Sequence, residues 1–189
     1  MNAPAAPTTK PDKRGFPVLY KLLTLIAAIQ TSLVEALAHA LQGRVGYRLP
    51  DYTIHRDGAP YLYRWWVIPR NPVFNVYYHV FVGSDEDEAL HDHPWVNLSI
   101  LLTGRYIEHG RAGKVSHRRT GDLVLRWPRT PHRIELPLSV AGKPLVASTL
   151  FLTGPRVRTW GFWCPQGWVP WYRFVDAKDK GTVGKGCAQ

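Results

Sequence analysis

The stretch from His91 to Asn97 reads HDHPWVN, and it decides how the rest of the chain is interpreted. Its two histidines are two residues apart, so on an extended strand their side chains point to the same side. The Asn97 side chain points to the same side as the two histidines if the strand stays regular past Pro94. Neutral imidazole is a favoured ligand for Fe, Zn, Cu, Ni and Mn. The stretch therefore predicts part of a metal site.

A third histidine, His132, begins a later apolar stretch, directly after the turn-like residues Trp127–Pro131. With His91 and His93 it would hold one divalent transition metal and leave coordination positions open for a substrate. Three surface histidines, or histidines with hydrogen-bond partners in the core, are the alternative interpretation. The spacing alone is compatible with both.

Short apolar stretches separated by turn residues surround these histidines. The predicted strands are Tyr61–Ile68, Val73–Val82, Trp95–Thr103, Arg105–Glu108, Asp122–Trp127, His132–Leu136, Leu145–Thr153, Val157–Trp163 and Val169–Phe174. Many short strands at close spacing, in a chain with 16 glycines and 16 prolines, are typical of an antiparallel sandwich or small barrel. We therefore predict a mainly β domain over residues 46–175.

Length and composition limit the class of protein. The chain has 189 residues, the usual size of one domain. Hydrophobic residues make up 45% and charged residues 20%, which excludes a wholly disordered chain. Two cysteines, Cys164 and Cys187, are too few for a disulfide framework, and the absence of a CxxC pair argues against a zinc ribbon. We expect a cytoplasmic protein.

The segments outside the β domain differ in character. Residues 1–16 are rich in proline and charge and predict a flexible tail, and residues 176–189 predict a polar C-terminal tail. Residues 17–43 are rich in Leu and Ala and predict one α-helix that ends at Gly43. Three interpretations of this helix remain: packing on the β domain or a partner subunit, peripheral contact with a membrane, or a cleaved signal sequence.

The region from Phe81 to Leu136 resembles the cupin family, whose first motif reads G-x5-H-x-H-x(3,4)-E-x6-G. His91, His93 and Gly104 match it, while Asn97 stands at the place of the glutamate. The second motif reads G-x5-P-x-G-x2-H-x3-N, and Gly121 and His132 have its separation of eleven. Departures from the motifs occur at Asp85, Arg129 and Leu136, which replace two glycines and the last asparagine.

This resemblance implies an antiparallel double-stranded β-helix, the jelly-roll barrel of the cupins, here preceded by the N-terminal helix. The chain is also similar to small cupin-like proteins of proteobacteria and their phages. A three-histidine site resembles the thiol and diketone dioxygenase branches, in which Fe(II) binds substrate and O2. Without the glutamate the site is one negative charge poorer, which favours a small anionic substrate. The family also implies a homodimer through sheet edges or the helix.

Four residues are candidates for binding the substrate: Asn97, Arg129, Tyr106 and His79. Arg129 lies in the turn before His132, where its guanidinium would hold a carboxylate or phosphate bidentately. His79 shares parity with Tyr77 and Phe81 on a predicted strand, so it is a candidate acid–base group or a histidine buried in the core.

Two alternatives to a metal-dependent dioxygenase remain at this stage. One is a non-catalytic module that binds a sugar, nucleotide or carboxylate. A related option is a metal-free isomerase or epimerase in which His79 or Tyr106 acts as the acid–base group. The other is a basic protein associated with nucleic acid, because the net charge is +10 and four tryptophans lie in residues 160–171. No nucleic-acid-binding motif supports it. The tryptophans equally predict a plug that closes one end of the barrel and covers the N-terminal helix.

Overall fold

A computed structural model of the chain describes residues 17–45, 47–56, 58–85, 89–178 and 183–188. The predicted tail at residues 1–16 lies outside this described part. The elements in chain order are α1 (Pro17–Val45), β1 (Tyr52–Arg56), β2 (Ala59–Trp66), β3 (Asn75–Phe81), β4 (Leu90–His91), β5 (Asn97–Thr103), β6 (Arg105–Gly110), a 3-10 turn (Arg111–Gly113), β7 (Val115–Arg119), β8 (Leu123–Arg126), β9 (His132–Glu135), β10 (Ala147–Thr153), β11 (Gly161–Cys164), β12 (Gly167–Pro170) and α2 (Trp171–Phe174).

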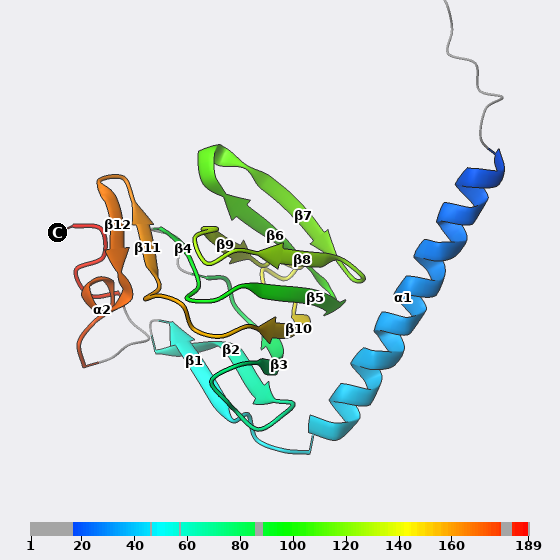
Figure 1. The fold of residues 1–189 in the computed structure, drawn as a ribbon, viewed down its shortest axis with the longest axis horizontal. Coiled ribbons are helices and arrows are strands. Elements are labelled where there is room, and N and C mark those ends of the chain that lie inside the picture. The colour runs from blue at the N-terminus through cyan, green and yellow to red at the C-terminus, as the bar shows by residue number, and fades with distance from the viewer. Residues whose placement is uncertain (1–16, 46, 57, 86–88, 179–182, 189) are drawn as a thin grey trace, which may run out of the picture.

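Two antiparallel six-stranded sheets form the β domain (Figure 1). In the first sheet the strand order is β1-β2-β3-β10-β5-β8, and in the second it is β12-β11-β4-β9-β6-β7. From β3 to β10 the chain changes sheet at every step except the β6–β7 hairpin. The resulting orders 3-10-5-8 and 4-9-6-7 are those of a jelly roll. The predicted antiparallel double-stranded β-helix is therefore confirmed.

Three strands were not predicted from the sequence. Strand β7 reads VSHRR and has no internal apolar pattern, because it is an edge strand with alternate residues exposed. Strand β1 has a single aliphatic residue, Ile54, and β4 has only two residues. The predicted strand Val169–Phe174 is partly wrong, since the chain leaves β12 at Pro170 and turns into α2.

The barrel core lies between the sheets. Its buried members are Leu62, Phe81, Leu101, Tyr106, Ile134, Leu136 and Ala147. The chain turns sharply from β5 into β6 at Gly104, which has φ +80°, and a Cβ there would lie 2.5 Å from the carbonyl oxygen of Val146. Both the conformation and the close approach favour glycine.

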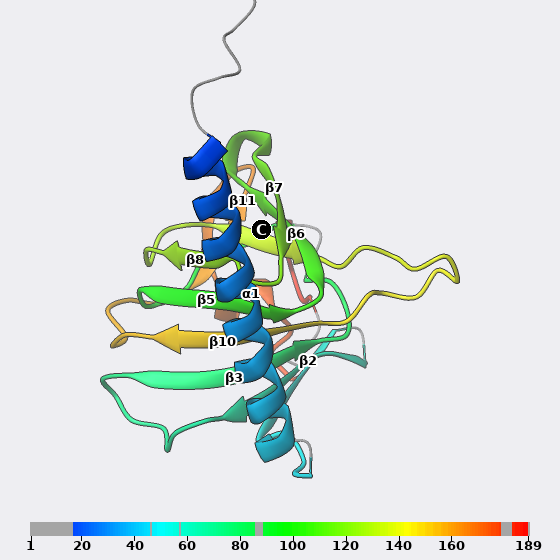
Figure 2. The same ribbon diagram turned by 90° about the vertical axis from the view of Figure 1, so that its right-hand side faces the viewer.

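Helix α1 crosses the outer face of the first sheet (Figure 2). Val34, Ala38, Leu41 and Val45 are buried in a cluster that includes Tyr78 and Leu102 of the sheet. Packing on the β domain is therefore observed for the C-terminal half of the helix. Among the described helices, α1 is also long and apolar enough to cross a membrane, judged by length and composition over Leu19–Val45.

The tryptophan-rich segment lies on the opposite side of the domain from α1 (Figure 1). Strands β11 and β12 and helix α2 form a third cluster there, with Ala89, Phe162, Cys164, Val169 and Phe174 buried. The prediction that this segment covers the N-terminal helix is therefore wrong. It packs against β4 instead, because β11 pairs with that strand.

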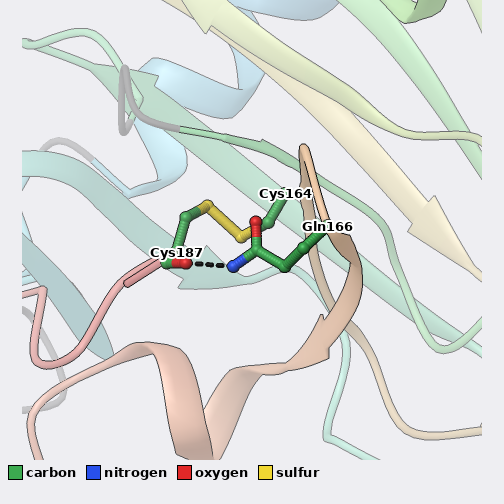
Figure 3. Close-up of a disulfide and its surroundings, with 3 residues drawn as sticks. All are labelled: Cys164, Gln166 and Cys187. Carbon is green, nitrogen blue, oxygen red and sulfur yellow. Dashed lines mark hydrogen bonds between the residues drawn. A yellow bond between two sulfur atoms is a disulfide. The ribbon is translucent and has the colours of Figure 1, made fainter. Parts of the chain in front are cut away.

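A single disulfide joins Cys164 of β11 to Cys187 near the C-terminus (Figure 3). The side-chain amide of Gln166 donates a hydrogen bond to the Cys187 carbonyl oxygen beside it. The sequence excluded a disulfide framework but did not predict this bridge. The pairing depends on α2, which turns the chain back toward β11.

Candidate metal centre

The three predicted histidines lie together at one end of the barrel. His91 of β4 is the direct antiparallel partner of His132 of β9, and His93 follows two residues after His91. One ring nitrogen from each histidine lies within 4.8 Å of the other two. The Nε2 atoms of His93 and His132 are 3.0 Å apart. Two nitrogens that bind one metal at about 2.1 Å with near-tetrahedral or octahedral angles lie roughly 3.0–3.4 Å apart. The arrangement therefore fits one divalent metal ion.

Two buried carboxylates stand behind these rings. Glu108 Oε1 is 3.4 Å from His132 Nδ1, which is longer than a strong hydrogen bond. Asp85 Oδ2 is 3.9 Å from His91 Nδ1 and accepts a hydrogen bond from the Ile134 amide at 2.7 Å. A carboxylate facing Nδ1 favours the tautomer that leaves Nε2 free for a metal. Asp85, which departs from the motif glycine, therefore has a position next to the site.

The charge of Glu108 is compensated by two arginines. Arg126 donates through Nε to Glu108 Oε1 at 2.7 Å, and Arg118 donates through Nε to Oε2 at 2.8 Å. Since both oxygens are engaged, Glu108 is held behind His132 rather than beside the other two histidines. The group of possible ligands found in the described part of the chain accordingly contains the three histidines alone.

Electrostatics keep two of the histidines neutral. Burial lowers the pKa of His93 well below its usual range, and the charges of His91 and Arg126 lower it further. Burial lowers the pKa of His132 in the same way, with Arg126 as the next contribution. Neutral imidazole is the form that binds a metal, so these rings need not lose a proton first at neutral pH.

A cavity of about 390 Å³ opens over the three histidines. One wall is aromatic and comes from the tryptophan-rich segment and α2, with Trp160, Phe162, Trp171 and Phe174. The opposite wall carries polar and charged side chains from the first sheet, with Tyr61, Arg64, His79, Ser99, Arg126 and Thr149. The volume and this mixed lining suit a small molecule with a polar end.

Of the four predicted substrate-binding residues, only His79 lines the cavity. Asn97 and Tyr106 are almost completely buried, outside the lining, and the Tyr106 side chain belongs to the barrel core. Neither the Asn97 amide nor the Tyr106 hydroxyl has a hydrogen-bond partner among the described residues. Arg129 is exposed in the turn after β8 and does not reach the cavity. Its closeness to His132 in the sequence was misleading, because the turn projects away from the barrel interior.

The cavity contains an arginine that the sequence analysis missed. Arg64 of β2 donates through Nε to His79 Nε2 at 2.8 Å, and its guanidinium carbon lies 5.0 Å from the centre of the Tyr77 ring. No carboxylate within the described ranges forms an ion pair with it. Its parity with the buried Leu62 on the predicted strand was the available signal that it points inward.

Asp92, between the first two histidines, ties them to the aromatic wall. Its side chain is fully buried and accepts hydrogen bonds from Gly161 N, Trp163 Nε1 and Trp168 Nε1, each at 3.0 Å, and pairs with Arg158 Nη1 at 2.7 Å. Because all four donors belong to the β10–β12 region, Asp92 fixes His91 and His93 relative to that wall.

Comparisons with known proteins give structural neighbours only. No family model and no curated protein sequence matches the chain. A double-stranded β-helix protein from Klebsiella pneumoniae has 18% identity and a TM-score of 0.43, over 59% of this chain and 90% of that one. A cupin-like protein from Thermotoga maritima has 16% identity and a TM-score of 0.42, over 66% and 86%. The DMSP lyase DddQ from Ruegeria pomeroyi has 14% identity and a TM-score of 0.41, over 52% of this chain and about half, 49%, of the lyase.

The fold follows from the strand order itself. The two interleaved sheets form the jelly roll that the motifs imply. His91 ends β4, His93 follows two residues later and His132 begins β9, and all three line one cavity. The chain has the cupin fold.

Proposed function

We propose that this cupin is a mononuclear metal enzyme that acts on a small carboxylate-bearing substrate, with Fe(II) as the metal and dioxygen as co-substrate. The observation that carries the proposal is the convergence of three histidine nitrogens in a cavity that also contains Arg64, for which the described part of the chain offers no carboxylate partner. A bound Fe(II) would supply Lewis-acid activation and dioxygen chemistry.

The charge balance of the cavity supports an anionic substrate. Three neutral imidazoles leave both positive charges of a divalent metal uncompensated. Arg126 shares the Glu108 carboxylate with Arg118, whereas Arg64 has no acidic partner among the described residues. A carboxylate on the substrate would therefore offset part of the positive charge of the metal and the guanidinium.

Arg64 is suited to hold that carboxylate. Its Nε is engaged by His79, and its two terminal nitrogens make no hydrogen bond within the described part of the chain. A guanidinium oriented from behind in this way loses little freedom when it binds a carboxylate. His79 Nε2 accepts the hydrogen bond from Arg64 Nε, which requires a neutral ring, and burial lowers the pKa of His79 and so favours that form.

Aromatic side chains shield one side of the histidine cluster. Phe162 and Phe174 stack with their ring centres 3.7 Å apart, and Trp160 stacks on Trp171 at 5.9 Å. These rings lie beside His91: Phe162 of β11 is its direct partner, and the His91 ring centre is 6.3 Å from that of Phe162 and 6.5 Å from that of Trp160. Apolar surroundings strengthen the interaction between Arg64 and a carboxylate.

The test combines metal content with oxygen consumption. The protein is loaded anaerobically with Fe(II), and wild type is compared with His91→Ala/His132→Ala. We expect near-stoichiometric iron in wild type and its loss in the double variant. Oxygen uptake is then measured with small carboxylates that carry a neighbouring thiol, hydroxyl or amino group.

Substitution of Arg64 tests the substrate class separately. Arg64→Met should raise the KM for the carboxylate at least about tenfold, as expected for a lost charge-assisted pair, while iron content stays unchanged. Arg129→Met is the matched control and should change neither. Iron binding with no oxygen uptake from any carboxylate would refute the enzyme and favour a binding module, and no metal binding would refute the centre itself.

A further inference from the structure

Helix α1 has a second apolar face that no described residue covers. Leu22, Ile26, Ile29, Leu33 and Leu37 each have 37–66% of their surface exposed. Their spacing of four, three, four and four residues places them on one side of the helix. The residues that pack on the sheet, such as Val34 and Leu41, lie on a different side, so barrel packing leaves this face unpartnered.

The N-terminal turns of α1 are apolar over an even wider arc. Leu19, Leu23 and Leu25 are exposed as well, and at 100° per residue they extend the face well beyond one stripe. A coiled coil covers only a narrow seam of two positions in seven. An exposed arc this wide therefore favours immersion in an apolar medium over pairing with one helix.

Basic side chains lie near α1, although not on its exposed apolar face. The helix contains one acidic residue, Glu35, and the chain carries a net charge of +10. Arg105 and Arg119 are direct partners across the β6–β7 hairpin, and both are exposed. They line an open groove of about 1090 Å³, together with Asp122 and the side of α1 that carries Ala27 and Thr31. Neither arginine forms an ion pair within the described ranges, so together with the net charge they attract an anionic surface over a distance.

The length of the free part of α1 decides how it would meet a bilayer. The helix is held to the domain from Gln30, whose side-chain amide donates a hydrogen bond to the Gly121 carbonyl oxygen at 2.7 Å, to Val45, so the unattached apolar part runs from Leu19 to Ile29. Eleven residues at 1.5 Å each give about 17 Å, which is shorter than the roughly 30 Å hydrocarbon core of a membrane. The attached helix therefore fits a position along the surface rather than across the bilayer.

We propose that α1 docks the protein on an anionic phospholipid surface. The face formed by Leu22, Ile26, Ile29 and Leu33 enters the boundary between headgroups and acyl chains. Arg105 and Arg119, on the side of the helix that faces the domain, contribute long-range attraction to the anionic surface. The polar side of α1, with Lys21, Ser32 and His39, stays in water.

The test is co-sedimentation of the full chain with vesicles of phosphatidylglycerol and phosphatidylcholine, compared with pure phosphatidylcholine. We expect binding to the anionic vesicles that weakens as salt is raised. Ile26→Glu/Ile29→Glu should weaken binding at least about tenfold, because two inserted side chains are lost. Ser32→Glu/His39→Glu is the matched control: it adds the same charge on the polar side and should have a smaller effect.

Further measurements separate a membrane from other partners. Arg105→Gln/Arg119→Gln should weaken binding to anionic vesicles by at most about fivefold per arginine, because both side chains lie on the side of α1 that faces the domain. The proposal is overturned if wild type does not bind the vesicles, or if the two glutamate variants behave alike. It is also overturned if sedimentation velocity shows a wild-type dimer that Ile26→Glu/Ile29→Glu dissociates while vesicles bind neither, since the face then belongs to a second copy.

Discussion

The cavity and helix α1 depart from the usual distribution of side chains in opposite directions. The barrel buries charged groups such as Asp92, Glu108 and Arg126, whereas α1 exposes a row of large aliphatic side chains. Inside, almost every charge has a partner, and Asp92 alone has four donors. Outside, the aliphatic face has none among the described residues. Both proposed binding sites lie where a complementary group is missing among the described residues: a carboxylate for Arg64 in the cavity, and an apolar neighbour for the Ile26 face of the helix.

The largest expected effect is at Asp92, where the interior network is densest. Asp92→Leu would remove the carboxylate that pairs with Arg158 and would leave the Gly161 amide and two indole N–H groups without their acceptors. Loss of one partner of a buried charge pair costs roughly 3–5 kcal/mol of unfolding free energy. Urea unfolding measures it, and Asp122→Asn, at a less buried turn, should cost far less. Equal losses would show that the network does not stabilise this end of the barrel.

The disulfide tests how far the aromatic wall depends on a covalent link. Cys164→Ser/Cys187→Ser removes a bridge with a sequence separation of 23. Loop closure of this length contributes about 3 kcal/mol in the chain-entropy description. We expect that loss in chemical denaturation of the oxidised protein, and no difference from wild type once both are reduced. A double variant as stable as oxidised wild type would contradict the prediction.

The two sides of α1 provide a direct comparison of covered and uncovered aliphatic residues. Leu41→Ala on the packed side should cost at least about 2 kcal/mol of unfolding free energy. Leu33→Ala on the exposed side should stay within about 0.5 kcal/mol, because that side chain loses no contact with the sheet. Thermal or urea unfolding of the two variants measures these two losses of unfolding free energy. A comparable cost at Leu33 in the absence of lipid would indicate that another part of the protein already covers this face.

The buried histidines predict a pH dependence of the metal-free protein. Burial lowers the pKa of His132, so the unfolded chain takes up a proton near pH 6.5 while the folded chain does not. Stability therefore falls as the pH decreases below about 6.5, by about 1.4 kcal/mol per pH unit for each such ring. His132→Gln should make the slope shallower, whereas His117→Gln, at an exposed position, should not. An unchanged slope in His132→Gln would show that the ring titrates normally.

The sequence predicted the histidine site better than its surroundings, and the reason is physical. Alternation along an extended strand is a local property, so the common side of His91 and His93 could be predicted from spacing. The meeting of His91 with His132 depends on pairing between β4 and β9, which the family resemblance supplied. Arg64 comes from β2, far from the motif in the chain, and no local pattern connects it with the histidines.

Errors arose where sequence proximity was taken for spatial proximity, or where polar strands lacked a pattern. Arg129 is near His132 along the chain but lies in an exposed turn, while Arg126, three residues earlier, is buried in β8. Strand β7 exposes alternate residues at the sheet edge and therefore resembles a loop. The cysteine pair required knowledge of the reversal at α2. Which side of α1 is covered depends on the sheet surface that it contacts. The composition of the helix does not determine it, because apolar residues occur on both sides.

The pairing of β4 with β9 has a consequence for how the protein is made. A single residue pair, His91 with His132, joins these strands, and residues 92–131 with β5 to β8 lie between them. Contacts between residues so far apart in the chain form slowly, because a long loop must close first. We therefore expect the histidines to come together late in folding, when most of the barrel has formed. In a zinc finger, by contrast, the metal organises an unfolded chain.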